Sequence, residues 1–355
     1  GLGIVFSQGI IFFTLPVYTY LFIPSEYGKI DLINTVGLLF NIIFIMGMDS
    51  TQGYYYMKDI NDNISPKKSL SSILRLRIVI GVLISLILIL ILTFLKDDIF
   101  GSSGLYLSFI LVIFINLFNA LINNNIEIFR LKFQPWTYNI FMFIQAVISV
   151  FLSVFFIVYY DYGINGYFLG FLISSLITSS FLFYFTRSNF IIKFEKIDFK
   201  YWISFLKYGV PLGLTSLAYQ FIISIDRFFI LDFKGAHELG IYAAGVNISM
   251  VSALIIVAFR KAWWPYAMEL INKDTFHQVN RKISIYFLFF AFLISSIITV
   301  SSPFLVQIFT DLKFINSWII VSLYSWVHIW FGFILISGLV LFKENKTSYI
   351  LFSFI

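Results

Sequence analysis

The segment that decides the fold reads GVPLGLTSLAYQFIISIDRFFILDFKGAHELGIYAAGVN and runs from Gly209 to Asn247. It begins as an apolar stretch long enough to cross a membrane, turns at a short polar loop and becomes apolar again. Asp226 and Arg227 stand side by side inside the first stretch. A charge near the bilayer centre costs about 2.5–3.5 kcal/mol, so this pair needs either a structural partner on another helix or a place beside a water-filled path.

The composition of the whole chain is that of a helical membrane protein. Of its 355 residues, 60 % are hydrophobic and 12 % are charged, and a soluble protein of this size has too little interior for so many apolar side chains. The chain contains no Cys, which excludes disulfides and thiol chemistry. Its Lys and Arg residues lie in short loops, as membrane topology requires, so the net charge of +6 does not indicate a nucleic-acid partner.

Apolar stretches of membrane length predict ten spans and the start of an eleventh. The predicted spans are residues 1–23, 30–56, 78–95, 105–129, 138–160, 166–186, 209–231, 240–259, 283–310 and 317–342, and 348 onward. The chain starts without Met and ends inside an apolar run, so we expect a trimmed piece of a protein with twelve spans. The even-numbered loops hold 19 of the 24 Lys and Arg residues, which places these loops and the N-terminus in the cytoplasm.

The distribution of basic residues also predicts an internal repeat. Loops one to four carry 1, 5, 1 and 2 basic residues, and loops seven to ten carry the same numbers. Ser25–Gly28 and His237–Gly240 occupy equivalent loops of this repeat. A period of six spans gives two lobes of the same orientation. We therefore predict an all-α integral membrane protein with two pseudo-symmetric six-helix lobes, residues 1–190 and 191–355, around a central cavity.

Polar residues at helical spacing mark the fourth span as a candidate lining of that cavity. The polar residues follow one another at +3, +4, +4 and +3 and share one face: Asn116, Asn119, Asn123, Glu127 and Arg130. In lipid such a face must contact other helices or water. Glu127 and Arg130 can pair with each other, and a snorkelling pair at the membrane surface explains these two equally well.

The seventh span carries a second polar stripe, formed by Ser216, Gln220, Ser224 and Arg227. Neighbours on a helix point about 100° apart, so we expect Asp226 and Arg227 to take separate partners in the outer half of the bilayer. Further polar residues of the spans are Asn34, Asn41, Asp49 and Gln52 in the second and Asn247 in the eighth. For Asp49, an ordinary carboxylate at the membrane surface is as good an interpretation as a functional one.

Two other features have alternative interpretations. Gly209, Pro211 and Gly213 lie near the cytoplasmic end of the seventh span and predict either a hinge or simply the start of the helix. Arg260 and Lys261 open a loop rich in Trp and Tyr, which predicts an anchor to anionic headgroups or a site for a phosphate-bearing lipid.

Several classes of activity find no support in the sequence. It contains no Gly-rich phosphate loop followed by Lys and Ser or Thr, so no ATPase motor is encoded here. The three His residues are scattered and do not form a metal-binding set, and no loop is large enough for an independent active site. We therefore expect a protein that is not an enzyme, with no metal and no organic cofactor.

The order of several short motifs resembles the bacterial polysaccharide flippases, the Wzx-type O-antigen transporters of the multidrug/oligosaccharidyl-lipid/polysaccharide exporter superfamily. The segments Gly209–Gly213, Asp226–Phe229 and Glu238–Ala244 are similar to the seventh-to-eighth span signature of that family. The segments Leu15–Pro16, Pro24–Gly28 and Met46–Asp49 are similar to its first-to-second span signature.

This resemblance implies a multi-pass protein of the bacterial inner membrane that moves an undecaprenyl-diphosphate-linked oligosaccharide, an O-antigen or related repeat unit, from the inner to the outer leaflet by alternating access. The polar stripes would bind sugar hydroxyls. Arg227, with Arg130, Arg260 or Lys261, would bind the diphosphate or acidic sugars. H⁺ or Na⁺ would be coupled through the carboxylates Asp49, Glu127 and Asp226. The implied partners are the lipid-linked oligosaccharide, the phospholipid bilayer and other polysaccharide-assembly proteins.

Two alternatives fit the sequence less well. A multidrug or cation antiporter of the same superfamily should have an acidic lumen, whereas the first span has no carboxylate and Arg227 lies within a span. A membrane-embedded O-antigen polymerase or glycosyltransferase would need a large outer loop with acidic and Arg residues, and the outer loops here are short.

Overall fold

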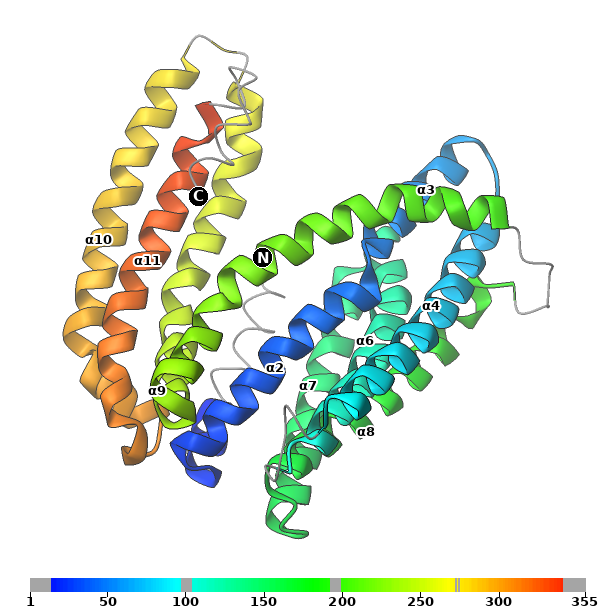
Figure 1. The fold of residues 1–355 in the computed structure, drawn as a ribbon. Coiled ribbons are helices and arrows are strands. Elements are labelled where there is room, and N and C mark those ends of the chain that lie inside the picture. The colour runs from blue at the N-terminus through cyan, green and yellow to red at the C-terminus, as the bar shows by residue number, and fades with distance from the viewer. Residues whose placement is uncertain (1–13, 97–103, 192–198, 272, 274, 341–355) are drawn as a thin grey trace. The chain divides into compact units, whose positions relative to one another are not determined.

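The computed structural model describes residues 14–96, 104–191, 199–271, 273 and 275–340, and within these ranges the chain is helical with short connections (Figure 1). The predicted all-α membrane fold is thereby confirmed. The helices are α2 (Pro24–Ile45), α3 (Met48–Asn61), α4 (Lys67–Phe94), α6 (Tyr106–Leu131), α7 (Pro135–Val158), α8 (Gly163–Thr186), η1 (Arg187–Asn189), α9 (Phe199–Leu270), α10 (Phe276–Phe309), η2 (Leu312–Ser317) and α11 (Trp318–Ser337).

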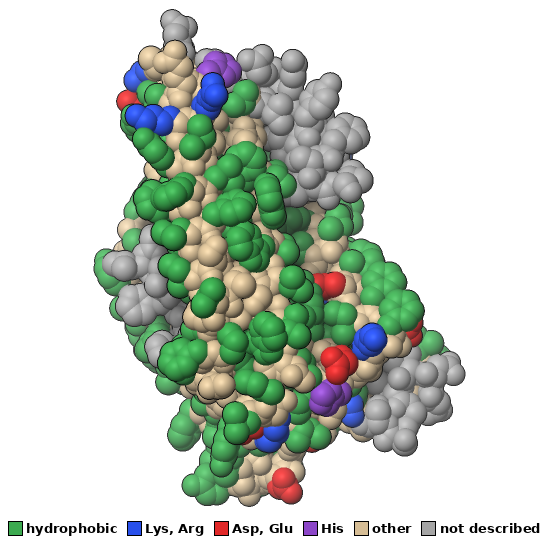
Figure 2. Space-filling view, turned by 90° about the vertical axis from the view of Figure 1, so that its left-hand side faces the viewer, with side chains coloured by type: hydrophobic (Ala, Val, Ile, Leu, Met, Phe, Trp, Pro, Cys, Tyr) green, Lys and Arg blue, Asp and Glu red, His purple; other side chains and the backbone are tan. Residues whose placement is uncertain are grey.

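Eight helices in the described ranges are long and apolar enough to cross a membrane. One of them, α9, has 72 residues and contains the predicted spans 209–231 and 240–259. Most of the predicted first span and the whole region beyond residue 348 lie outside the described residues, so the number of spans stays a prediction. Hydrophobic side chains are spread over the face drawn in Figure 2, with charged side chains mainly toward its ends, as expected for a surface in contact with lipid.

The chain forms two compact units, one made of Gly1–Gly28 with Lys234–Ile355 and the other of Lys29–Phe233. The division into lobes at residues 190 and 191 stays a prediction. In the unit Lys29–Phe233, helix α8 packs against α7 and α6, and α6 also packs against α4. A Cβ added at Gly170 of α8 would lie 2.2 Å from the Ser153 backbone nitrogen, so glycine is what lets α7 and α8 approach this closely.

The predicted second span, 30–56, is interrupted in the structure. Met46 and Gly47 have φ values of 45° and 69°, and this left-handed pair separates α2 from α3. Helix α9 passes directly over the break, because a Cβ on Gly47 would lie 2.2 Å from the Gly209 carbonyl oxygen. Since α9 begins at Phe199, Pro211 does not start the helix, and that interpretation of Pro211 is wrong. A hinge there stays a prediction.

In the other unit, the last part of α9 packs with α10 and α11 around one apolar cluster that includes Trp263. Trp263 is buried and α9 continues to Leu270, so Arg260–Tyr266 is part of a helix and the predicted loop is wrong; a role of this segment as a headgroup anchor or lipid site stays a prediction. Gly235 has φ 83° and ψ 176°, which interrupts the helical geometry of α9 between the two predicted spans. A Cβ on Gly240 would lie 1.8 Å from the Pro24 carbonyl oxygen, so the two equivalent segments of the predicted repeat contact each other, but both are helical in the structure and the prediction that they are loops is wrong.

Candidate functional site

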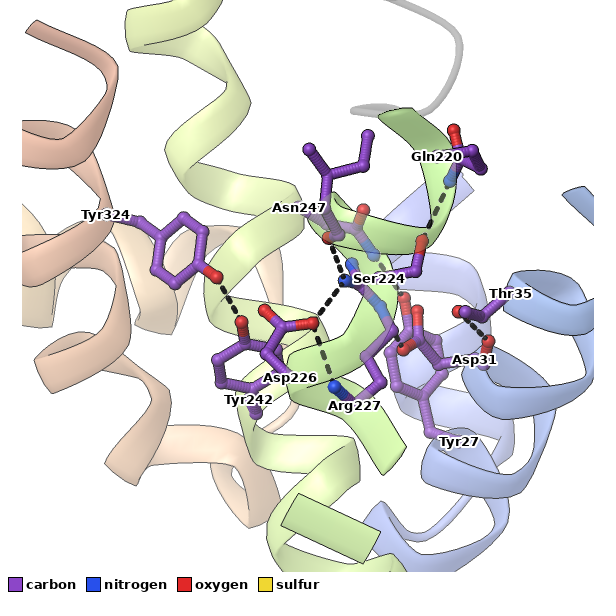
Figure 3. A network of polar contacts seen from close by, with 11 residues as sticks. Tyr27, Asp31, Thr35, Gln220, Ser224, Asp226, Arg227, Tyr242, Asn247 and Tyr324 are labelled. Carbon is purple, nitrogen blue, oxygen red and sulfur yellow. Dashed lines mark hydrogen bonds and ion pairs between the residues drawn. The ribbon is translucent and has the colours of Figure 1, made fainter. Parts of the chain in front are cut away.

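A three-residue charge cluster joins α2 to the seventh predicted span. The Arg227 guanidinium lies between two carboxylates: its Nε donates to Asp31 Oδ2 at 3.0 Å and its Nη1 to Asp226 Oδ1 at 3.2 Å. The three side chains point toward one another (Figure 3). The side chains of Arg227 and Asp31 are 15 % and 17 % exposed, so the pair is largely shielded from solvent. When all three groups are charged, the cluster has a net charge of −1.

The expectation that Asp226 and Arg227 do not contact each other is wrong, whereas the expected partner on a neighbouring helix is found for Arg227. Asp226 Oδ1 accepts from the Arg227 backbone nitrogen at 2.8 Å as well as from its guanidinium. The angle of about 100° separates the two Cα–Cβ directions. The short Asp side chain still reaches the next N–H group, and the long Arg side chain bends back toward it. Arg227 additionally gains a partner on another helix, which is the structural role that its position in an apolar span demanded.

Asp31 is a functional candidate that sequence reasoning missed. It lies at the very start of the predicted second span and was not singled out from the sequence. A signal was present, because Asp31, Asn34 and Asn41 are spaced by three and seven residues and lie along one side of α2. In the structure Asn34 Nδ2 donates to the Tyr167 hydroxyl of α8 at 3.3 Å. The polar side of α2 therefore contacts other helices, α9 through Asp31 and α8 through Asn34.

The predicted polar face of α6 contacts neighbouring helices. Asn116 is buried and accepts from Asn41 Nδ2 of α2 at 3.0 Å, while its own Nδ2 donates to the Val112 carbonyl. Asn119 accepts from Gln145 Nε2 of α7 at 3.2 Å. Asn123 is half-buried on the same helix. The amides of three helices are therefore linked across this part of the unit.

At the end of α6, Glu127 and Arg130 form the predicted pair. Arg130 Nε lies 2.8 Å from both Glu127 carboxylate oxygens. Their exposures differ strongly, since the Arg130 side chain is 65 % exposed and the Glu127 side chain is 9 % exposed. Arg130 is thus accessible to a ligand, whereas Glu127 is held inside. Asp49 of α3 is half-buried and interacts electrostatically with both residues.

The remaining candidates have separate surroundings. Gln220 Nε2 donates to Ser224 Oγ one turn along α9 at 2.8 Å. Gln52 is fully buried and donates to the Asn124 carbonyl of α6 at 2.9 Å. Lys261 is exposed, and the Arg260 side chain lies outside the described residues.

Asn247 belongs to a second polar group, which lies in the unit Gly1–Gly28 with Lys234–Ile355. Its Nδ2 donates to the Tyr27 hydroxyl at 3.0 Å, and the hydroxyls of Tyr242 and Tyr324 are hydrogen-bonded to each other nearby along α9 and α11 (Figure 3). Tyrosines can be satisfied in an apolar interior only with such partners. In the part of the chain that the structure describes, no group of three or more His, Cys, Asp or Glu side chains is placed to hold a metal ion.

The sequence is similar to a known protein family and to a curated relative. Residues 1–271 match the model of a family described as polysaccharide biosynthesis protein. A protein of the Lsg locus of Haemophilus influenzae is 26 % identical over 163 residues. This match covers 44 % of the chain and spans 40 % of the length of that relative.

The solved structures that resemble the chain are transporters. An inward-facing multidrug resistance MATE family transporter of the MOP superfamily superposes with a TM-score of 0.73 at 14 % identity, covering 98 % of this chain and 82 % of the other. The outward-facing conformation of such a transporter gives 0.66 at 14 % identity, covering 99 % and 82 %. A Vibrio cholerae MATE transporter in its bent form gives 0.55 at 15 % identity, covering 97 % and 86 %. At these identities the likeness establishes the fold.

Proposed function

Because the chain belongs to the family of polysaccharide biosynthesis proteins, we propose that it moves a lipid-linked oligosaccharide from the inner to the outer leaflet of the bacterial inner membrane. The chain is a multi-pass membrane protein with a transporter fold, and the family confirms the resemblance drawn from its sequence motifs. The proposed substrate is an undecaprenyl-diphosphate-linked repeat unit, carried by alternating access. The lipid carrier, the glycan and the ion are parts of the proposal.

The amide-rich packing between helices of the unit Lys29–Phe233 is the observation that carries the choice of substrate. Its linked polar groups on α2, α6 and α7 are Asn41, Asn116, Asn119 and Gln145. An amide side chain both donates and accepts hydrogen bonds, as a sugar hydroxyl does. Each amide pair can therefore exchange its internal hydrogen bond for one to a hydroxyl without leaving a buried group unsatisfied.

The charge cluster supplies a route to ion coupling. A diphosphate that contacts Arg227 would compete with Asp31 and Asp226 for the same guanidinium N–H groups, since arginine binds phosphate and carboxylate in the same way. The displaced carboxylate would take up H⁺ or Na⁺ in place of the guanidinium charge. Asp49 and Glu127 are further candidates for coupling. Arg130, Arg260 and Lys261 are the candidates for first contact with the diphosphate at the cytoplasmic side.

A second candidate function is the export of cationic drugs. It is favoured by the two carboxylates around Arg227 and by the likeness of the fold to multidrug resistance MATE family transporters. The net charge of −1 in the cluster would suit a cation. The amide pairs, which match sugar hydroxyls in both donating and accepting, are the reason for preferring a lipid-linked glycan.

The test is a flipping assay with the purified full-length protein in vesicles. A lipid-linked oligosaccharide with a fluorescent group on the glycan is quenched by an impermeant reagent, and protein-dependent movement raises the fraction that is quenched. We expect Arg227→Met to abolish this movement and Lys313→Met, in an exposed basic residue, to leave it intact. Movement at the wild-type rate in Arg227→Met would remove the cluster from the mechanism. Export of a cationic dye without movement of the glycan would favour the second function.

The proposed orientation has an independent test. The basic even-numbered loops would face the cytoplasm, with the N-terminus on the same side. Alkaline phosphatase fused after Lys132 should be inactive, whereas a fusion after Asp161 should be active. The reverse pattern would overturn the orientation and leave the fold unaffected.

A further inference from the structure

The unit Lys29–Phe233 contains a buried arginine that none of the proposed steps uses. Arg77 of α4 is 2 % exposed, although it lies among the basic residues that the sequence assigned to a cytoplasmic loop. Its Nη1 donates to the Ala120 carbonyl of α6 at 3.2 Å. Its Nε and Nη2 are also buried and have no partner among the described residues. A guanidinium with one hydrogen bond is far from satisfied, because it carries five N–H donors.

Two buried amides converge on the same place. Gln52 of α3 donates to the Asn124 carbonyl, and Asn124 lies one helical turn after Ala120. Arg77 and Gln52 therefore approach a single turn of α6, residues 120–124, from two different helices. Gln52 and Asn124 are both fully buried. Within the described residues, Gln52 Oε1 and both side-chain polar atoms of Asn124 also lack partners.

Five buried polar atoms around one turn of α6 lack a hydrogen-bond partner among the described residues, which is costly. Each buried polar atom without a hydrogen bond carries a desolvation penalty, and that penalty is larger for a charged group. For five atoms together it would be comparable to the whole stability of a typical folded domain. Something that fits between α3, α4 and α6 must therefore satisfy them.

The chemistry of the five atoms selects the occupant. Arg77 Nε, Arg77 Nη2 and Asn124 Nδ2 need acceptors, whereas Gln52 Oε1 and Asn124 Oδ1 need donors. A cation would be repelled by the guanidinium. An anion would meet the negative charges of Asp49 and Glu127, which interact electrostatically with Arg77. Water both donates and accepts, and a buried water typically makes about three hydrogen bonds to such groups.

We propose that turn 120–124 of α6 borders a buried water-binding site, formed with Arg77 of α4 and Gln52 of α3. The water molecules bridge the guanidinium to the two amides and hydrate the space between this cation and the nearby carboxylates. In this proposal α3, α4 and α6 contact one another at this turn through water molecules and not through apolar side chains. The proposal depends on neither the substrate nor the coupling ion.

The test uses a thiol as a small internal probe. Because the chain has no Cys, the S–H stretching band of a single introduced cysteine is isolated in the infrared spectrum. Asn124→Cys places the thiol in the proposed water site. Ile126→Cys is the matched control, since Ile126 is equally buried two residues along α6 in an apolar cluster with Phe141 and Leu182.

We expect the Asn124→Cys thiol of the folded protein to exchange to S–D in D₂O at least about tenfold faster than the Ile126→Cys thiol, because exchange in a dry interior needs local opening. Equal, slow exchange in both variants would overturn the proposal. If Asn124→Cys does not fold, Gln52→Cys carries the same test against Met48→Cys, whose side chain packs in an apolar cluster one turn earlier on α3. Equally slow exchange in that pair would overturn the proposal as well.

Discussion

The ion pair between Arg227 and Asp31 should make a measurable, coupled contribution to stability. At 3.0 Å, two unit charges attract by about 5–6 kcal/mol for an effective dielectric constant near 20. Removing one partner of a buried pair typically costs about 3–5 kcal/mol, because it leaves an uncompensated charge. Both side chains keep some exposure, so we expect Arg227→Met and Asp31→Asn each to lower the free energy of unfolding by about 2–4 kcal/mol.

The double variant Asp31→Asn with Arg227→Met isolates the interaction energy between the two residues. Because it leaves neither charge uncompensated, its loss of stability should be smaller than the sum of the single losses by about 1–3 kcal/mol. The measurement is unfolding of the purified protein in mixed micelles as the fraction of a denaturing detergent is raised. Asp226 is retained in all variants, so the double variant still holds one carboxylate of the cluster.

An exposed pair provides the control for this cycle. Lys313 and Asp311 are 3.9 Å apart, with side chains that are 44 % and 22 % exposed, and their coupling should be below about 1 kcal/mol. If the losses of Asp31→Asn and Arg227→Met simply add, the two residues do not interact in the folded protein. That result would refute the cluster on which the coupling proposal rests.

Three further substitutions, two of them with a matched control, test the packing. Gly240→Ala should prevent folded protein from accumulating, because its Cβ would lie 1.8 Å from a carbonyl oxygen of α2. Gly53→Ala should be tolerated, because its Cβ would lie 3.8 Å from the nearest atom. Size-exclusion chromatography of membrane extracts measures the folded protein of both variants. Asn116→Leu should cost about 1–3 kcal/mol in the micelle assay, since it leaves the half-buried amide of Asn41 on α2 without its acceptor. In the same assay, Trp263→Ala should cost about 3–5 kcal/mol, and Trp264→Ala much less because Trp264 is exposed.

The membrane helices could be predicted because their cause is local. A span needs about 20 apolar residues, and every backbone group within it must be satisfied internally, so apolar length and helix go together. The same rule placed the end of one span and the start of the next on either side of Gly235, where the structure has its interruption. The polar stripe on α6 was equally local, because the spacing of its amides fixes which face they share.

The buried charges could not be located by that rule. Apolar length put the start of the third span at residue 78, whereas α4 begins at Lys67 and includes Arg77. Leu70, Ile73, Leu74 and Arg77 follow one another at helical spacing, and all four are buried, so the periodicity of the buried face carried the missing information. A search for long apolar stretches misses this periodicity, because a single charged residue such as Arg77 ends the stretch.

Some features have causes that are distant in the sequence. The break at Met46 and Gly47 depends on the backbone of Gly209 lying against it, more than 160 residues away. The partner of Arg227 on α2 is similarly remote. Trp263 is surrounded by aromatic and basic neighbours typical of a membrane surface, yet packing against α10 and α11 buries it. Only the tertiary contacts decide these cases.

The contact between the helical segments at Gly28 and Gly240 limits which residues can stand at these two positions. The chain leaves one compact unit after Gly28 and returns to it at Lys234. The two points lie close together within that unit, because a Cβ on Gly28 would be 2.1 Å from the Ala236 carbonyl oxygen. A side chain at either Gly28 or Gly240 would overlap the backbone of the other segment, so this crossing closes only with glycine at both positions.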